Sequence, residues 1–135
     1  MKSRDAVSRL KRFEVEEKQR KVAEIEMMIG DFNQMAHDLD RQIAVEQERS
    51  GVSDTNHYAY PTFAKAAIQR RDNLLASAAD LEVKLTIARE TLAEAFEDLK
   101  KIELLEERDA ERMKVEQARA ADLGAVANMP HRVAS

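Results

Sequence analysis

The sequence predicts an all-α protein in which two long helices form an antiparallel coiled-coil hairpin, with the second helix longer than the first. Three observations indicate this fold. Aromatic residues make up 4% of the chain and 36% of residues are charged, a composition typical of long helices and not of a deep globular core. Only three glycines and two prolines interrupt the 135 residues. Apolar residues also recur at alternating spacings of three and four positions, as in a coiled coil.

The first helix is expected over about residues 3–49. Its central apolar residues alternate three and four positions apart, which places them on one buried seam. They are Val22, Ile25, Ile29, Phe32, Ala36, Leu39 and Ile43. Three pairs of opposite charge at i,i+4 precede the seam, and each pair stabilises a helix by about 0.2–0.5 kcal/mol. They are Glu14–Lys18, Glu16–Arg20 and Glu17–Lys21.

A loop is expected over about residues 50–60. Gly51 tolerates the positive φ of a helix C-terminal cap, and Pro61 suits the first turn of the next helix. Tyr58, Tyr60 and Phe63 lie close together here, beside His57. They form either a hydrophobic cap that closes the hairpin or an aromatic docking surface. Both interpretations hold together if one tyrosine packs inward and another faces out.

The second helix is expected over about residues 61–123. Nine of its residues continue the alternation of three and four without a slip. They are Leu74, Ala78, Leu81, Leu85, Ala88, Leu92, Ala95, Leu99 and Ile102. A single loop between the helices predicts that Ile43 lies near Ala67 and Val22 near Ala88.

Residues 1–123 are therefore expected to form one domain, in which the part from about 109 to 123 extends past the first helix without an intramolecular partner. Gly124 is expected to end the second helix. Residues 124–135 are expected to be a disordered tail, because they contain Pro130 and show no periodicity.

Charge is distributed unevenly along the first helix. Residues 1–21 carry eight basic and four acidic side chains, whereas residues 22–50 carry two basic and seven acidic ones. The basic end predicts an acidic protein partner. Nucleic acid is not expected as a partner, because a pI of 5.5 and an acidic middle are unlike the broad basic face of a nucleic-acid binder. Phe13 is out of phase with the main seam, so it is either a stutter in the coil or a residue that meets a partner.

No enzymatic chemistry is predicted. Cysteine is absent, which removes thiolate metal sites and disulfides. The three histidines, His37, His57 and His131, lack a second ligand at metal-binding spacing, and no glycine-rich phosphate loop is present. We therefore expect no cofactor, no metal and no catalytic residue. No apolar run has the ~20 residues of a transmembrane helix, and no secretory signal is expected, which favours a cytoplasmic location without membrane insertion.

Two segments resemble the FliJ-type flagellar export proteins, in particular their alphaproteobacterial branch. The first is the opening Met-Lys-Ser-Arg-Asp-Ala-Val-Ser-Arg-Leu-Lys-Arg-Phe, and the second is Tyr-Ala-Tyr-Pro-Thr-Phe-Ala-Lys-Ala-Ala-Ile-Gln-Arg-Arg-Asp-Asn-Leu-Leu at residues 58–75. The resemblance implies a cytoplasmic antiparallel coiled coil of the flagellar type III export apparatus, associated peripherally with the inner-membrane flagellar base. Such a protein links the export ATPase ring to the cytoplasmic domain of the membrane export gate, and it is connected with recycling of export chaperones.

The resemblance also implies two sets of partner-binding residues. The set expected at the ATPase is Arg9, Leu10, Arg12, Phe13, Arg112 and Arg119. The set expected at the gate is Tyr60, Phe63 and Ala67. Near the gate set this chain departs from enterobacterial members, because it carries Arg70 and Leu74 where they have polar or small residues.

Two other functions remain open from the sequence. A self-associating structural coiled coil would bury Met28, Met35 and Phe96 in a dimer. A general export chaperone is the other alternative.

Overall fold

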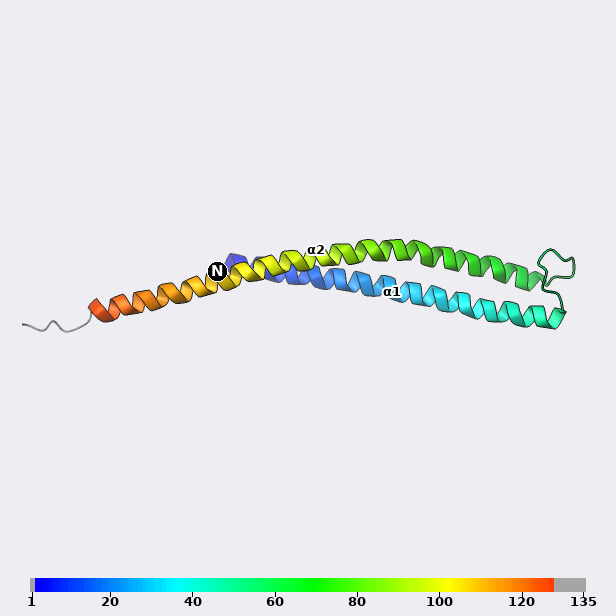
Figure 1. Cartoon of the computed structure of the whole chain (residues 1–135), viewed down its shortest axis with the longest axis horizontal. Helices are drawn as coiled ribbons and strands as arrows, with labels where there is room; N and C mark the ends of the chain where they lie inside the picture. The colour runs from blue at the N-terminus through cyan, green and yellow to red at the C-terminus, as the bar shows by residue number, and fades with distance from the viewer. Residues whose placement is uncertain (1, 128–135) are drawn as a thin grey trace, which may run out of the picture. The chain divides into compact units, whose positions relative to one another are not determined.

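The computed structural model describes residues 2–127, and the side chains of residues 5–127. Helix α1 spans Lys2–Ser50 and helix α2 spans Thr62–Ala127 (Figure 1). The described part of the chain is thus all-helical apart from the connection between the helices. At 66 residues, α2 is longer than α1, which has 49, so the predicted helix number and order of lengths are confirmed.

The predicted end of the second helix is wrong. Helix α2 continues through Gly124 to Ala127, four residues beyond the expected end at residue 123. A glycine ends a helix when it adopts the left-handed conformation, and Gly124 does not have a positive φ. Inside a helix, glycine costs only about 1 kcal/mol relative to alanine. The remainder of the expected tail, residues 128–135, lies outside the described residues.

The loop begins and ends with backbone caps. Gly51 has a φ of 70°, and its N–H donates to the carbonyl of Gln47 at 2.9 Å, so the predicted glycine cap of α1 is confirmed. At the other end, the carbonyl of Pro61 accepts a hydrogen bond from the N–H of Lys65 at 3.1 Å. Pro61 thereby directly precedes α2 and supplies its first carbonyl.

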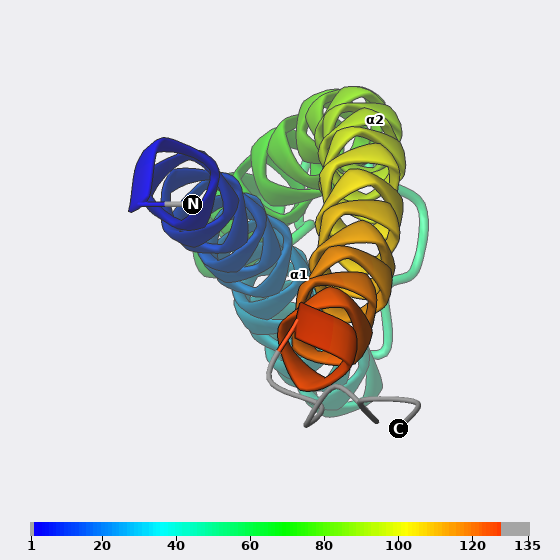
Figure 2. The same cartoon turned by 90° about the vertical axis from the view of Figure 1, so that its left-hand side faces the viewer.

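The chain divides into two compact units, which are described separately. The loop unit is Glu16–Glu94, and the terminal unit combines Met1–Val15 with Ala95–Ser135. In the loop unit α1 and α2 lie side by side in both views of the molecule (Figures 1 and 2). Each helix contributes one apolar stripe to their contact.

Two apolar clusters join the helices of the loop unit. The cluster nearer the loop holds Leu39, Ile43 and Ala67. The other cluster holds Val22, Ile25, Ile29, Leu81 and Leu85. Positions near the loop on α1 therefore contact positions near the loop on α2, and positions farther out contact positions farther out. The predicted neighbours Ile43 and Ala67 share a cluster, and Ala88 packs against the cluster that contains Val22.

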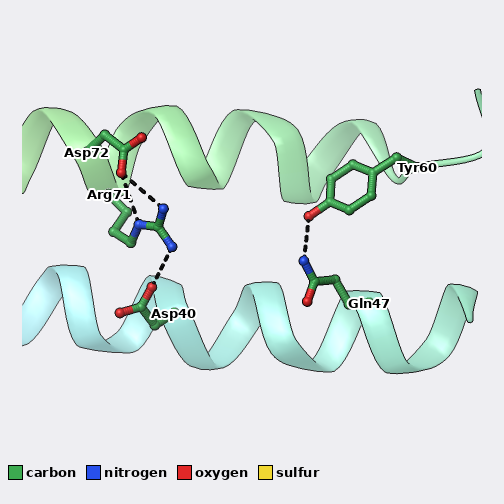
Figure 3. A network of polar contacts seen from close by, with 5 residues as sticks. All are labelled: Asp40, Gln47, Tyr60, Arg71 and Asp72. Atoms are coloured by element: carbon green, nitrogen blue, oxygen red, sulfur yellow. Dashed lines mark hydrogen bonds and ion pairs between the residues drawn. The ribbon is translucent and has the colours of Figure 1, made fainter. Parts of the chain in front are cut away.

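Polar contacts also connect the helices of the loop unit. The Arg71 guanidinium lies 2.8 Å from a carboxylate oxygen of Asp40 on α1 and 3.0 Å from Asp72 (Figure 3). The hydrogen bonds to Asp40 and then to Asp72 raise the pKa of Arg71 above its usual range. Farther along, Arg89 lies 3.4 Å from Glu26.

The three predicted i,i+4 pairs of α1 are wrong. Glu14 instead accepts from Lys11 at 3.3 Å, and Glu17 pairs with Arg20, both at i,i+3. Exposed pairs contribute only about 0–1 kcal/mol, so small differences in side-chain geometry decide which partner a carboxylate takes. Among the described side chains, Lys18 and Lys21 are consequently without an ion pair.

Candidate partner-binding surfaces

The α1 part of the terminal unit exposes two large apolar side chains beside an arginine. Leu10 is 55% exposed and Phe13 54% exposed, and Arg9 is exposed next to them. Since residues three and four apart lie on one helix face, these three side chains form one surface. We call Arg9, Leu10 and Phe13 the terminal surface.

Phe13 does not mark a stutter in the described helix. The positions of α1 in the terminal unit that are not fully exposed are Ser8, Lys11, Glu14 and Val15, and three of them, Ser8, Lys11 and Val15, are spaced three and four apart. The inner face of the helix is therefore continuous, and polar residues, Ser8 and Lys11, occupy two of its positions. Phe13 lies off that face, which leaves contact with a partner as the open interpretation of its exposure.

The other expected ATPase residues lie in the same unit. A guanidinium nitrogen of Arg12 is 3.9 Å from a carboxylate oxygen of Glu106 on α2, so Arg12 also serves the contact between the helices. Arg112 and Arg119 lie within residues 110–127 of α2, which are all exposed. These two arginines are thus accessible, which agrees with the prediction that this end of α2 extends past α1.

Ser8 is an unfavourable polar residue inside the terminal unit. Its side chain is completely buried, and its Oγ has no hydrogen-bond partner among the described residues. A buried hydroxyl without a partner loses its hydrogen bonds to water on folding. It lines a small cavity together with Asp5, Arg9, Arg12 and Glu106.

Replacing Ser8 by alanine is expected to stabilise the protein. Removing the unpaired hydroxyl contributes about 1 kcal/mol, and the higher helix propensity of alanine adds a few tenths, roughly 0.5 kcal/mol. Urea unfolding followed by circular dichroism measures the sum. Ser77→Ala, at an exposed position of α2, is the control for helix propensity alone. A Ser8→Ala protein less stable than the parent would show that the hydroxyl is hydrogen-bonded, for example to water.

The loop end of the molecule separates the aromatic residues into inner and outer ones. Tyr60 is buried, and its Oη accepts a hydrogen bond of 2.9 Å from Nε2 of Gln47 on α1 (Figure 3). Tyr58 is 95% exposed and stacks on His57 with ring centroids 4.6 Å apart. One tyrosine therefore packs inward and the other faces out, as the combined interpretation predicted.

Only one of the three expected gate residues is exposed. Phe63 is more than half exposed, whereas Tyr60 and Ala67 are buried. Ala67 is occupied by its cluster with Leu39 and Ile43. A partner that approaches the loop end thus meets Phe63 and Tyr58, while Tyr60 and Ala67 hold the helices together.

The backbone of the loop is fixed by short-range hydrogen bonds. The N–H of Asn56 donates to Oδ1 of Asp54 at 2.9 Å, and the N–H of Ala59 donates to Nδ1 of His57 at 3.0 Å. Tyr60 N–H donates to the carbonyl of His57 at 3.1 Å. Such side-chain to backbone bonds are typical of turns, and they hold Tyr60 in position to reach Gln47.

The structure adds residues that the apolar pattern did not reveal. Arg71 occupies the inner face of α2, three positions before Leu74, and Gln47 is the partner of Tyr60. Counting the seam spacing backwards from Leu74 would have placed Arg71 there. Elsewhere on α1, hydrogen bonds from Arg41 and then Gln34 hold the pKa of Asp38 below its usual range.

The residues that the structure describes contain no group of three or more histidine, cysteine, aspartate or glutamate side chains arranged to hold a metal ion. Nor does either helix, over the same residues, have an apolar window long enough to cross a membrane.

Comparison with models of known protein families gave no match, and neither did comparison with curated proteins or with solved structures. The likeness to the FliJ-type proteins therefore rests on the sequence of residues 1–13 and 58–75.

Proposed function

We propose that the chain is a non-enzymatic antiparallel coiled coil that acts as a stalk in the flagellar type III export apparatus. In this proposal the terminal unit contacts the export ATPase in the cytoplasm, and the loop end contacts the cytoplasmic domain of the export gate at the flagellar base. Contact with export chaperones is part of the same proposal. The antiparallel pairing is supported by the contacts of Arg71 with Asp40 and of Arg89 with Glu26.

One observation carries the ATPase contact. The terminal surface exposes two large apolar side chains on a helix whose inner face lies elsewhere. Exposed apolar residues grouped with an arginine are typical of protein interfaces. Arg112 and Arg119, on the exposed part of α2, add positive charge for an acidic partner.

The gate contact is supported by fewer residues. Phe63 and Tyr58 are the exposed aromatic side chains near the loop, and aromatic anchors are favoured at interfaces. We therefore assign this contact to Phe63 and Tyr58. Tyr60 and Ala67, the other residues implied by the resemblance, act through the fold because they are buried.

The double variant Arg9→Glu with Arg12→Glu tests the ATPase contact. We expect it to weaken binding to the host's flagellar export ATPase at least about tenfold, because two attractive charges become repulsive. Co-purification and a titration followed by calorimetry measure the loss. Circular dichroism should show unchanged helicity.

The matched control is Lys100→Glu with Lys101→Glu, which reverses two exposed charges on α2 of the same unit. Equal weakening by both double variants would indicate a general charge effect and would count against the terminal surface. No binding of the parent chain to the ATPase would count against the stalk itself.

A self-associating coil is the second candidate. Met28 and Met35 are both at least 40% exposed, so a dimer could cover them. Sedimentation equilibrium separates the candidates: a monomer at tens of micromolar favours the stalk, and a stable dimer favours self-association.

A further inference from the structure

A groove of about 400 Å³ lies between α1 and α2 in the loop unit. Its apolar lining comes from both helices and includes Ile25, Met28, Leu81 and Ile87. Ile25 and Leu81 are buried and form the floor, whereas Met28 is 45% exposed and Ile87 is 58% exposed. The groove thus offers apolar area at its floor and along its edges.

Three lysines line the same groove, namely Lys18, Lys21 and Lys84, and no carboxylate does. None of the three has an ion pair or hydrogen bond within the described residues. The two carboxylates that the spacing predicted as partners of Lys18 and Lys21 are taken, because Glu14 pairs with Lys11 and Glu17 pairs with Arg20. Three positive charges therefore remain available around an apolar floor.

The ion pairs that join the two helices of the loop unit use other residues. Arg89 pairs with Glu26, and Arg71 pairs with Asp40, and none of these four lines the groove. The ion pairs that connect α1 to α2 in the loop unit therefore lie outside the groove. The positive charge along the groove makes no such contribution to the fold among the described residues.

We propose that this groove binds an amphipathic helix with acidic flanks from a partner protein. Its apolar residues, spaced three and four apart, would cover Ile25, Met28 and Ile87, and its glutamates or aspartates would pair with Lys21 and Lys84. A groove between two helices that lie side by side can accept a third helix, whose side-chain ridges pack into the groove. This surface differs from the terminal surface and from Phe63 and Tyr58, so it goes beyond the stalk proposal.

Charge selects this occupant over a second copy of the chain. If two copies met groove to groove, the three lysines of one copy would face those of the other. Like charges brought together at an interface oppose association. An acidic helix meets the same lysines with attraction and covers the same apolar area.

The test uses a synthetic 15-residue peptide, dye-labelled, with leucines spaced three and four apart and glutamates on both flanks. Fluorescence anisotropy at low salt measures its binding to the full-length chain. We expect saturable binding that Lys21→Glu with Lys84→Glu weakens at least about tenfold and that Met28→Ala weakens about threefold. A peptide with lysines in place of the glutamates should not bind.

The control variant is Lys65→Glu with Lys100→Glu, which changes the net charge equally at exposed positions outside the groove. Circular dichroism establishes that all variants stay helical. Equal weakening by both double variants, or no saturable binding of the acidic peptide to the parent, would overturn the proposal. So would a dimer of the parent chain, detected by sedimentation, that Lys21→Glu with Lys84→Glu dissociates, because it would assign the groove to a second copy.

Discussion

Replacing Leu85 with alanine is expected to lower the free energy of unfolding by about 2–4 kcal/mol. Leu85 is 4% exposed and belongs to the cluster that joins α2 to Val22, Ile25 and Ile29 of α1. Truncation removes the apolar area that Leu85 buries and leaves a cavity between the helices. Urea or thermal unfolding followed by circular dichroism measures the change.

Val83→Ala is the matched control, two residues away on the same helix. Val83 is 62% exposed, so its truncation loses little buried area and gains helix propensity of roughly 0.6 kcal/mol. We expect unchanged or slightly higher stability. Equal destabilisation by the two variants would contradict the inner face assigned to α2.

Tyr60→Ala is expected to have an effect of similar size, about 3 kcal/mol, because it removes a buried aromatic ring in the loop that connects α1 to α2. Tyr60→Phe isolates the hydroxyl. It leaves Nε2 of Gln47 without its 2.9 Å acceptor and should cost about 1 kcal/mol. The difference between the two variants measures the contribution of the ring itself.

Tyr58→Ala provides the comparison, since Tyr58 is almost fully exposed and its loss should leave stability within about 0.5 kcal/mol. The same variant also tests the proposed binding of the export gate. If the loop end binds the export gate as proposed, Tyr58→Ala should weaken that binding while unfolding is unchanged. Large destabilisation by Tyr58→Ala would contradict the assignment of Tyr58 as the exposed tyrosine and Tyr60 as the buried one.

The helices and the loop could be predicted from the sequence because apolar spacing and the position of Gly51 are local signals. The contact of Ile43 with Ala67 followed from the position of the loop. Arg71 lies where the same spacing continues before Leu74, but a pattern of apolar residues does not indicate that a charged residue occupies a position on the inner face. Its place there depends on Asp40, which lies 31 positions earlier in the chain.

The candidate sites were less predictable than the helices. Tyr58 and Tyr60 are equally aromatic, and the sequence does not indicate which of them packs inward; in the structure Tyr60 is buried and accepts a hydrogen bond from Gln47. Spacing alone also favoured Glu14–Lys18, although Lys11 competes for the same carboxylate. That Lys18 and Lys21 have no ion pair is evident only from the structure, which shows the partners that Glu14 and Glu17 take.

The contact between Arg71 and Asp40 has a consequence for how the chain selects one alignment of its helices. A coiled coil can slip by seven residues and still match apolar positions, because the pattern repeats with that period. The residues one heptad before and after Asp40 are Asn33 and Gln47, which carry no charge. Either slipped alignment would leave the partly buried Arg71 with Asp72 of its own helix as its counter-charge and would lose the contact with Asp40 across the helices. The loss of that contact raises the energy of both misaligned states and widens the gap that separates them from the native one.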